Sequence, residues 1–300
     1  MRVDVNITGH RSHTPVPSVR SRNPVTEQRI VMANPLHSTL QPPTMIGPTL
    51  VDGAIRRAFR APAAHIVSFP RAGQLWLRVM LALTIERTTQ TTSANPFDLD
   101  ARTRTDGSLP RLMLSHGKQD PRLWTPAQAS AMPTWQQDRR CILLTRDPRD
   151  ILVSLHAERT MRSRIDPRIP HFDGDVGALL RSERGGLRTI LQWQRTWLAA
   201  LAQCEASLHV QYEHLHQDPA LELGRICQFI GLAATPAIID EVVQASSFAA
   251  ARVLEDGGRF GQFGSSLPRD ARLLRRGVVG GWRDHFSRDD AMWADGVIDV

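Results

Sequence analysis

Short apolar runs recur along the chain, and longer segments with helical character separate them. The runs cover residues 64–69, 141–145 and 207–212. Runs of this length, bounded by turn residues, are typical of buried strands. The segments long enough for helices include 75–83, 186–201 and 220–230. Strands that alternate with helices predict a single α/β domain, in which helices flank a central parallel β-sheet.

The first 60 residues show no such pattern. They hold seven prolines between Pro15 and Pro48, among Ser, Thr and Asn. A segment of this kind buries too little apolar surface to offset the entropy lost on ordering. We therefore expect a disordered or weakly ordered leader at 1–60 and a folded domain at 61–300. An over-extended gene start and a transit peptide remain alternatives, although the prolines oppose the amphipathic helix of a transit peptide.

The composition is that of an ordinary globular protein, with 41% hydrophobic and 22% charged residues in a chain of 300. The net charge is +7, and all but one of the 37 basic residues are arginines. A guanidinium group can bind a phosphate or carboxylate through two parallel hydrogen bonds, so an anionic partner is expected. Residues 1–60 carry +5 of this charge, which leaves +2 for the predicted domain. Individually placed arginines therefore support the anionic partner better than bulk charge does.

The three cysteines lie far apart, with no spacing typical of a zinc site. This favours a reduced interior and a cytoplasmic protein, with no metal. No window approaches 18 continuous apolar residues, so we expect no membrane span.

A glycine-containing loop follows the first apolar run. Residues 70–76 read Pro-Arg-Ala-Gly-Gln-Leu-Trp and lead into the first predicted helix. The N–H groups of such a loop and the positive end of the helix dipole converge on an anion, which makes the loop similar to a phosphate-binding P-loop. The second glycine and the Lys-Ser/Thr pair of a nucleoside triphosphatase loop are missing, so triphosphate hydrolysis is poorly supported. A plain strand-to-helix turn remains the alternative.

A second loop, at 146–150, follows the second apolar run. If a helix starts near Asp150, the hydroxyl of Ser154 lies beside the guanidinium of Arg146 at the strand end. An arginine and a hydroxyl suit a phosphate monoester. A helix cap at Asp150 with a surface salt bridge would explain Asp150 but not Arg146.

Together the two loops resemble the sulfotransferase family that uses 3′-phosphoadenylyl sulfate (PAPS). Residues 69–76 are similar to its 5′-phosphosulfate loop, and Arg146, Pro148, Asp150 and Ser154 to its 3′-phosphate motif. Further similar segments are 111–117, 212–215, 246–248 and 274–282. The resemblance covers about residues 64–287.

The resemblance implies a sulfotransferase domain at 61–300 that transfers a sulfuryl group from PAPS to a hydroxyl or amine, without a metal. His116 would act as the general base, and Arg71 would balance charge on the departing adenosine 3′,5′-bisphosphate. The donor-binding residues that it implies are Arg71, Ala72, Gly73, Gln74, Leu75, Trp76, Arg146, Ser154, Tyr212, Ser246, Phe248, Arg275, Arg276 and Gly277.

The first loop departs from the family at three positions. Ala72, Gln74 and Leu75 stand where the family usually has hydroxyl or small amide side chains. A pseudoenzyme of the same fold, which binds the nucleotide without transfer, is therefore the alternative function. A nucleic-acid binder is a third hypothesis, but no helix-turn-helix, zinc or RNA-recognition signature supports it, and we expect no nucleic-acid partner.

The acceptor is not identified by the sequence, and a small molecule, a glycan and a peptide all remain open. Four arginines follow the second loop, and either an acidic acceptor or a solvated basic surface would explain them: Arg159, Arg162, Arg164 and Arg168. The oligomeric state also stays open, a homodimer included, because residues 283–292 only partly resemble the family's dimerisation segment.

Overall fold

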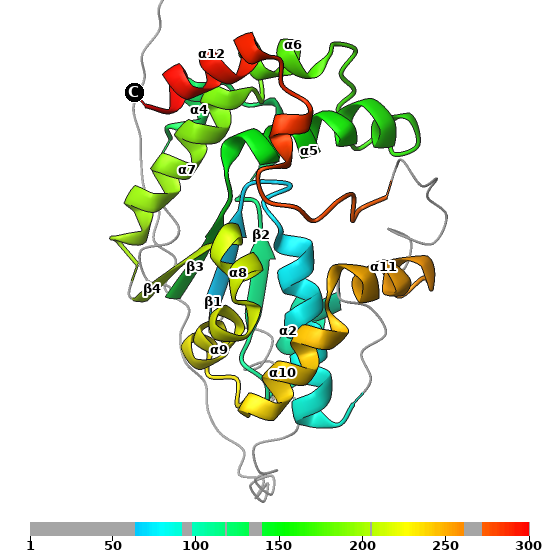
Figure 1. Ribbon diagram of the computed structural model, residues 1–300. Coiled ribbons are helices and arrows are strands. Elements are labelled where there is room, and N and C mark those ends of the chain that lie inside the picture. Colours follow the sequence, from blue (N-terminus) through cyan, green and yellow to red (C-terminus); the bar gives the residue numbers. More distant parts are fainter. Residues whose placement is uncertain are drawn as a thin grey trace, which may run out of the picture. The chain divides into compact units, whose positions relative to one another are not determined.

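The computed structural model (Figure 1) describes residues 64–91, 98–117, 119–131, 140–204, 206–260 and 272–299. The leader expected at 1–60 lies outside these residues. The described part begins with the first predicted strand.

In the described part of the chain, four parallel strands form the sheet, in the order β2-β1-β3-β4. They are β1 (Ala64–Ser68), β2 (Leu112–Ser115), β3 (Arg140–Thr145) and β4 (Ala206–Gln211). Ile66 in β1 lies opposite Leu114 in β2 and Ile142 in β3. The prediction of an α/β domain with a parallel sheet is confirmed. Because the strands are parallel, their carboxyl ends share one edge, and the loops that leave them gather there.

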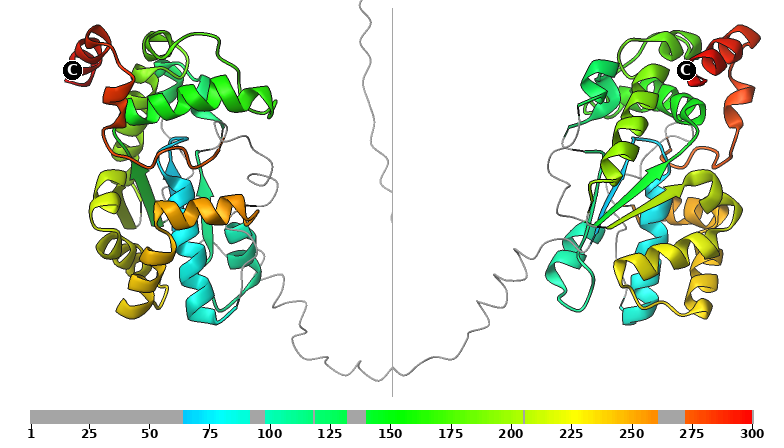
Figure 2. Two further views of the ribbon diagram at one scale, coloured as in Figure 1. Left: turned by 45° about the vertical axis from the view of Figure 1, so that its right-hand side comes forward. Right: turned by 90° about the vertical axis from the view of Figure 1, so that its left-hand side faces the viewer.

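Alternate side chains of the strands supply two separate hydrophobic cores. Ile66 and Ile142 pack on one face, against helices that include α2 (Gln74–Thr89), α9 (Pro219–Ile230) and α10 (Pro236–Ala245). Val67 and Leu143 pack on the other face, against α5 (Pro148–Met161) and α7 (Leu187–Leu201). This is the period of two expected of a strand that is buried on both faces. Figure 2 shows helices on both sides of the sheet.

The predicted helices are present as α2, α7 and α9. Helices α7 and α9 start within one residue of the expected position and end where expected, whereas α2 extends to Thr89 instead of ending at 83. The helix expected to start near Asp150 is α5, which begins two residues earlier, at Pro148. Its N-cap is Asp147, whose carboxylate accepts the Arg149 N–H at 2.8 Å. Proline suits the first helical position because its missing N–H would have no partner there. Tyr212, expected at a strand end, instead begins helix α8.

The remaining elements surround this framework. The other helices are α3 (Leu99–Thr105), α4 (Pro126–Ala129), α6 (Val176–Arg181), α8 (Tyr212–Gln217), α11 (Phe248–Asp256) and α12 (Arg288–Ile298), with 3₁₀ turns at Pro121–Leu123, Arg162–Arg164 and Gly281–Asp284. Within the described ranges, no helix combines the length and apolarity needed to cross a membrane. The three cysteines are free thiols, and no group of three or more His, Cys, Asp or Glu side chains in this part of the chain could hold a metal ion.

Trp193 on α7 connects this framework to the glycine loop. Its side chain is fully buried, and its ring meets Phe69, just after β1, edge to face at 5.6 Å between centroids. It also lies 5.4 Å from the ring of Trp197. The aromatic cluster thus supports the strand end from which the loop starts.

We expect Trp193→Ala to lower the free energy of unfolding by about 3–5 kcal/mol, because the truncation leaves a cavity under the loop. Urea denaturation measures this loss. Leu198→Ala, on the same helix at a side chain that is 40% exposed, is the control and should change stability by under about 0.5 kcal/mol. Equal losses for the two variants would contradict the assignment of Trp193 to the core.

Candidate functional site

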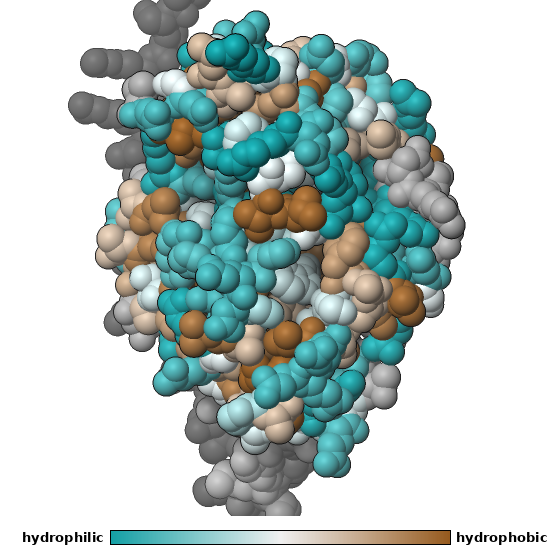
Figure 3. All heavy atoms as spheres, in the orientation of Figure 1, coloured by the Kyte–Doolittle hydropathy of each residue, from teal (hydrophilic) through white to brown (hydrophobic). Residues whose placement is uncertain are grey.

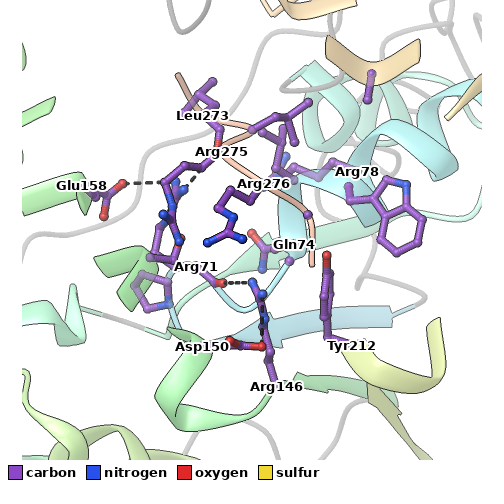
Figure 4. Close-up of a pocket in the computed structure, with 18 of the residues that line it drawn as sticks. Arg71, Gln74, Arg78, Arg146, Asp150, Glu158, Tyr212, Leu273, Arg275 and Arg276 are labelled. Atoms are coloured by element: carbon purple, nitrogen blue, oxygen red, sulfur yellow. Dashed lines mark hydrogen bonds and ion pairs between the residues drawn. The ribbon is translucent and has the colours of Figure 1, made fainter. Parts of the chain in front are cut away.

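A cavity of about 660 Å³ opens at the carboxyl edge of the sheet. Its wall comes from the loops after β1 and β3, from the ends of β2 and β4, and from the segment before α12. Figure 4 shows side chains from these segments converging in it. The volume lies in the usual range for a small-molecule site. On the face seen in Figure 3, apolar surface gathers near the middle, where the segment from residue 272 to 280 crosses in Figure 1.

The backbone of the glycine loop is in the left-handed region at two positions. Arg71 has φ 71° and Gly73 has φ 105°. A Cβ atom on Gly73 would lie 2.4 Å from the ring of Tyr212, so only glycine fits there. A non-glycine residue in this region stores of order 1–3 kcal/mol of strain, which is typical of functional loops. Ala72 between them is buried in the core under the sheet edge.

The Arg71 side chain joins the two predicted loops. Its Nε donates to the Ser154 hydroxyl at 2.9 Å, and its Nη2 donates to the Leu273 carbonyl at 3.0 Å. Its Nη1 lies 3.6 Å from the Glu158 carboxylate, one of the contacts drawn in Figure 4. The guanidinium therefore spans from the glycine loop to helix α5 and to the C-terminal segment.

Arg146 lies on the other side of the same space. Its Nη2 donates to the Val278 carbonyl at 2.9 Å, and its guanidinium stacks over the ring of Tyr212 at 4.2 Å. Its Nε is buried and has no partner among the described residues. A buried donor without a partner is costly, so this atom fits a ligand that accepts hydrogen bonds.

Asp150 connects the start of α5 to the C-terminal segment. Its carboxylate accepts the N–H of Gly280 at 2.8 Å and that of Trp282 at 2.9 Å, and it lies 3.6 Å from Nη2 of Arg146. The side chain is almost fully buried. The alternative of a surface salt bridge with a helix cap at Asp150 is wrong, because this carboxylate is internal and the cap is Asp147.

Arginines crowd the centre of the cavity, as Figure 4 shows. Burial lowers the pKa of Arg275, and the nearby charges of Arg71, Arg276 and Arg146 lower it further, while Asp150 opposes them. Cations with so few counter-charges repel one another in a low dielectric. The cavity is thus suited to a ligand with several negative charges.

His116 follows β2 at the edge of the cavity. Its Nδ1 lies 2.9 Å from the Ser68 carbonyl. Because a carbonyl only accepts, Nδ1 carries the proton and Nε2 keeps its lone pair. Burial lowers the pKa of His116, the bond to Ser68 opposes this, and the charge of Arg78 lowers it further. The imidazole is therefore neutral near pH 7 and can accept a proton.

Gln74 connects His116 to the glycine loop. Its side-chain amide donates to the Ser115 carbonyl at 2.9 Å, and the Ser115 hydroxyl accepts the Gly117 N–H at 3.1 Å. Gln74 itself is buried at the start of α2. These bonds fix the distance between the loop and the histidine.

Aromatic side chains form the remaining wall. Trp76 Nε1 donates to the Ser246 carbonyl at 2.8 Å, and the ring of Trp76 meets that of Tyr212 at 5.9 Å. Phe248 packs against Gly277, where a Cβ atom would lie 2.4 Å from its ring. Such rings could stack with a flat ligand group.

The cavity brings together all the site residues predicted from the sequence except two. Ala72 lies in the core, and Ser246 is fully buried behind Trp76, with Ser247 lining the cavity instead. Asp120, Arg122 and Glu158 also line the cavity and belong to none of the predicted motifs. Glu158 could have been found, since it follows Ser154 by four residues and so shares its face of the helix.

A parallel α/β sheet with a glycine loop and an arginine-lined cavity at its carboxyl edge defines an α/β protein built to bind a multiply charged anion. A family model described as "Sulfotransferase domain" matches residues 62–299. The chain belongs to the sulfotransferase family.

Two curated relatives illustrate the similarity. The chain is 26% identical to mouse Sulfotransferase 2B1 over 74% of this chain and 66% of the mouse protein, so it spans just under two thirds of that relative. It is 27% identical to the 3-beta-hydroxysteroid sulfotransferase of Cavia porcellus over 74% of this chain and 77% of that protein.

Solved structures share the fold. Mouse sulfotransferase SULT7A1 complexed with PAP superimposes with a TM-score of 0.52 at 17% identity, over 80% of this chain and 85% of that one. Retinol dehydratase in complex with androsterone and inactive cofactor PAP gives a TM-score of 0.53 at 17% identity, over 83% and 84%.

We expect Asp150→Asn to loosen the C-terminal segment, because an amide cannot accept both the Gly280 and the Trp282 N–H groups as the carboxylate does. The free energy of unfolding should fall by about 1–3 kcal/mol, the cost of an unpaired buried polar group. Hydrogen exchange should accelerate in the peptide containing Gly280 and Trp282. Asp289→Asn, at an exposed position of α12, is the matched control. Unchanged exchange in Asp150→Asn would contradict the anchoring role.

Proposed function

We propose that this chain transfers a sulfuryl group from PAPS to a hydroxyl or amine of an acceptor, with His116 as the general base. The observation that carries the proposal is the single cavity in which crowded arginines, a buried Arg146 Nε without a described partner and a neutral His116 meet. Family membership and two structural neighbours with PAP in their titles support it.

The donor fits the residues of the cavity. The loop around Gly73 and the first N–H groups of α2 would hold the 5′-phosphosulfate. Arg146, Ser154 and the segment Arg275–Gly277 would hold the 3′-phosphate, and Trp76, Tyr212 and Phe248 would contact the adenine. When bound, PAPS supplies the sulfuryl group together with adenosine 3′,5′-bisphosphate (PAP) as its leaving group.

His116 would take the proton of the acceptor as its oxygen or nitrogen attacks sulfur. The bond from Nδ1 to the Ser68 carbonyl leaves Nε2 as the accepting atom. A positioned base of this kind contributes roughly 10²–10⁴-fold to the rate. Gln74 would keep His116 at a fixed distance from the glycine loop through the Ser115 carbonyl.

Arg71 would balance the negative charge that develops on the leaving group, an electrostatic contribution aimed at the transition state. Its contacts to Ser154 and Leu273 hold the guanidinium over the loop before any ligand arrives. Sulfuryl transfer, like phosphoryl transfer, depends mainly on this kind of positioning, which the protein supplies without covalent chemistry.

The alternative is a pseudoenzyme that binds PAPS or PAP without transfer. Two positions of the glycine loop motivate this alternative. The Gln74 amide already donates to the Ser115 carbonyl, and Ala72 packs in the core, so neither side chain is free to contact the phosphosulfate of the donor. The neutral, oriented His116 favours the active enzyme. The proposed domain remains residues 61–300, and the proposed location is the cytoplasm.

Isothermal titration with PAP and turnover of labelled PAPS over a panel of phenols, amines, sugars and alcohols test the proposal. We expect PAP binding and transfer to some acceptor. His116→Ala should reduce turnover by roughly 10²–10⁴-fold and leave the Kd for PAP unchanged. His214→Ala, at an exposed histidine, should match the unaltered protein. Absence of PAP binding would refute both functions, and binding without turnover would select the pseudoenzyme.

The lowered pKa of His116 sets the pH profile. A base with a pKa below its usual 6.5 is protonated, and inactive, only at more acidic pH. The kcat/KM should therefore rise with pH to a plateau, with its midpoint below 6.5, and stay level between pH 7 and 8. A midpoint above 6.5 in the initial-rate profile would argue against His116 as the base.

A further inference from the structure

The cavity wall is more polar on the side of His116 than elsewhere. From His116 to Arg122, and along α5 to Arg162, the described residues that line it are glycine or carry polar or charged side chains. Its apolar lining residues lie on other segments and include Leu75 on α2, Phe248 on α11 and Leu273, whose carbonyl accepts a hydrogen bond from Arg71. The wall beside the general base is therefore hydrophilic.

Four charged residues of this wall form one continuous array: Asp120, Arg122, Glu158 and Arg162. The guanidinium of Arg122 binds Asp120, with 2.8 Å between Nε and Oδ2, and its Nη1 reaches Glu158 at 3.2 Å. Glu158 also receives Nη1 of Arg162 at 3.2 Å. We call this set the charged array.

The charged array lies within electrostatic reach of the proposed base. The carboxylates of Asp120 and Glu158 both act on the pKa of His116, which they raise against the larger effect of burial. An acceptor whose hydroxyl meets His116 would thus have its neighbouring atoms against the array. The remainder of the cavity would be taken by the donor.

The array already holds its charges in ion pairs. Arg122 and Arg162 face the two carboxylates, and Arg71 of the glycine loop also lies 3.6 Å from Glu158, so a charged acceptor would have to displace existing ion pairs, which is costly in a buried site. Burial raises the pKa of Asp120, but the hydrogen bonds from Arg122 and the charges of Arg122 and His116 together lower it below its usual value, so this carboxylate stays ionised. An ionic acceptor would therefore compete with ion pairs that the array has already formed.

Hydrogen-bonding capacity remains in the array. The side chain of Arg162 is over 90% buried, and its Nε has no hydrogen-bond partner among the described residues. Burial lowers the pKa of Arg162 and the charge of Arg71 adds to this, against the opposing charge of Glu158. Carboxylate oxygens also have spare lone pairs. Neutral hydroxyl groups, which both donate and accept, can use this capacity.

An apolar alcohol would fit poorly in the same place. It would cover charged groups without replacing their hydrogen bonds to water, a loss that a hydroxyl-rich ligand avoids. Among the other arginines that follow the second loop, Arg159 lies within electrostatic reach of Arg122, Asp120 and Glu158. Arg159 donates to the Pro170 carbonyl, Arg168 pairs with Asp166, and Arg164 is exposed.

We propose that the charged array is the acceptor subsite and that it selects an uncharged, polyhydroxylated acceptor of carbohydrate type over an apolar alcohol. The inference rests on the proposed transfer from PAPS. It names the acceptor class that the proposed function leaves open.

The test compares methyl β-D-glucopyranoside with dehydroepiandrosterone and 4-nitrophenol, with labelled PAPS as donor and the full chain as enzyme. We expect the glycoside to have the highest kcat/KM. Arg162→Met should raise the KM for the glycoside about tenfold, because a buried charged donor is lost, and leave the Kd for PAP unchanged. Arg164→Met, two residues away and exposed, is the matched control and should have no effect.

A double variant provides a second test of the inference if Arg162→Met folds poorly. Glu158→Leu combined with Arg162→Leu removes the Glu158–Arg162 pair together with the contacts of Glu158 to Arg122 and Arg71, and it should shift the preference toward dehydroepiandrosterone, provided that PAP still binds. If no acceptor is turned over, saturation-transfer NMR of the glycoside with the PAP complex decides. Contact that Arg162→Met abolishes supports the inference, and lack of contact overturns it.

The outcomes separate the two proposals. Failure to bind PAP overturns the proposed function. PAP binding with a higher kcat/KM for dehydroepiandrosterone or 4-nitrophenol than for the glycoside overturns the acceptor inference alone.

Discussion

The carboxylate of Asp150 is the contact on which the rest of the site depends. It is buried at the start of α5, where it accepts two backbone N–H groups from residues 130 and 132 positions further along the chain. These bonds bring the end of the C-terminal segment against the sheet edge. Arg275 and Gly277 precede that anchor directly, so their place in the cavity depends on it. A single internal carboxylate thus links the strand loops to the segment that completes the cavity.

The arginines around this anchor are arranged for a ligand more than for the stability of the free protein. Their charges repel one another, burial adds a desolvation penalty, and Arg146 keeps a buried donor without a described partner. Arg71 also holds a left-handed backbone conformation. Such local costs persist where the surrounding structure enforces them, and they are relieved when a multiply charged anion binds. The electrostatics of the cavity and the proposed donor therefore agree.

The two ends of the cavity differ in charge and in the polarity of their side chains. The donor end combines aromatic rings with an excess of positive charge. The end beside His116 combines charges of both signs, and the described lining residues from His116 to Arg122 and along α5 have no apolar side chain. The chain therefore differs in its proposed acceptor from relatives whose names refer to steroids.

The sequence by itself determined β1, β3 and β4, helices α2, α7 and α9, and the two loops, because these depend on local apolar pattern, glycine and proline. Strand β2 was indicated only by the resemblance of residues 111–117 to a family segment. It also indicated His116 and most of the donor-side residues through short motifs. Only the tertiary structure decided that Asp150 anchors a distant segment, that Ser246 lies behind Trp76, and that Arg122 meets Glu158. These contacts join residues far apart in the chain, and the order of the strands in the sheet sets which loops meet. The local sequence pattern does not specify the order of the strands, so the residues at the acceptor end of the cavity could be identified only from the folded structure.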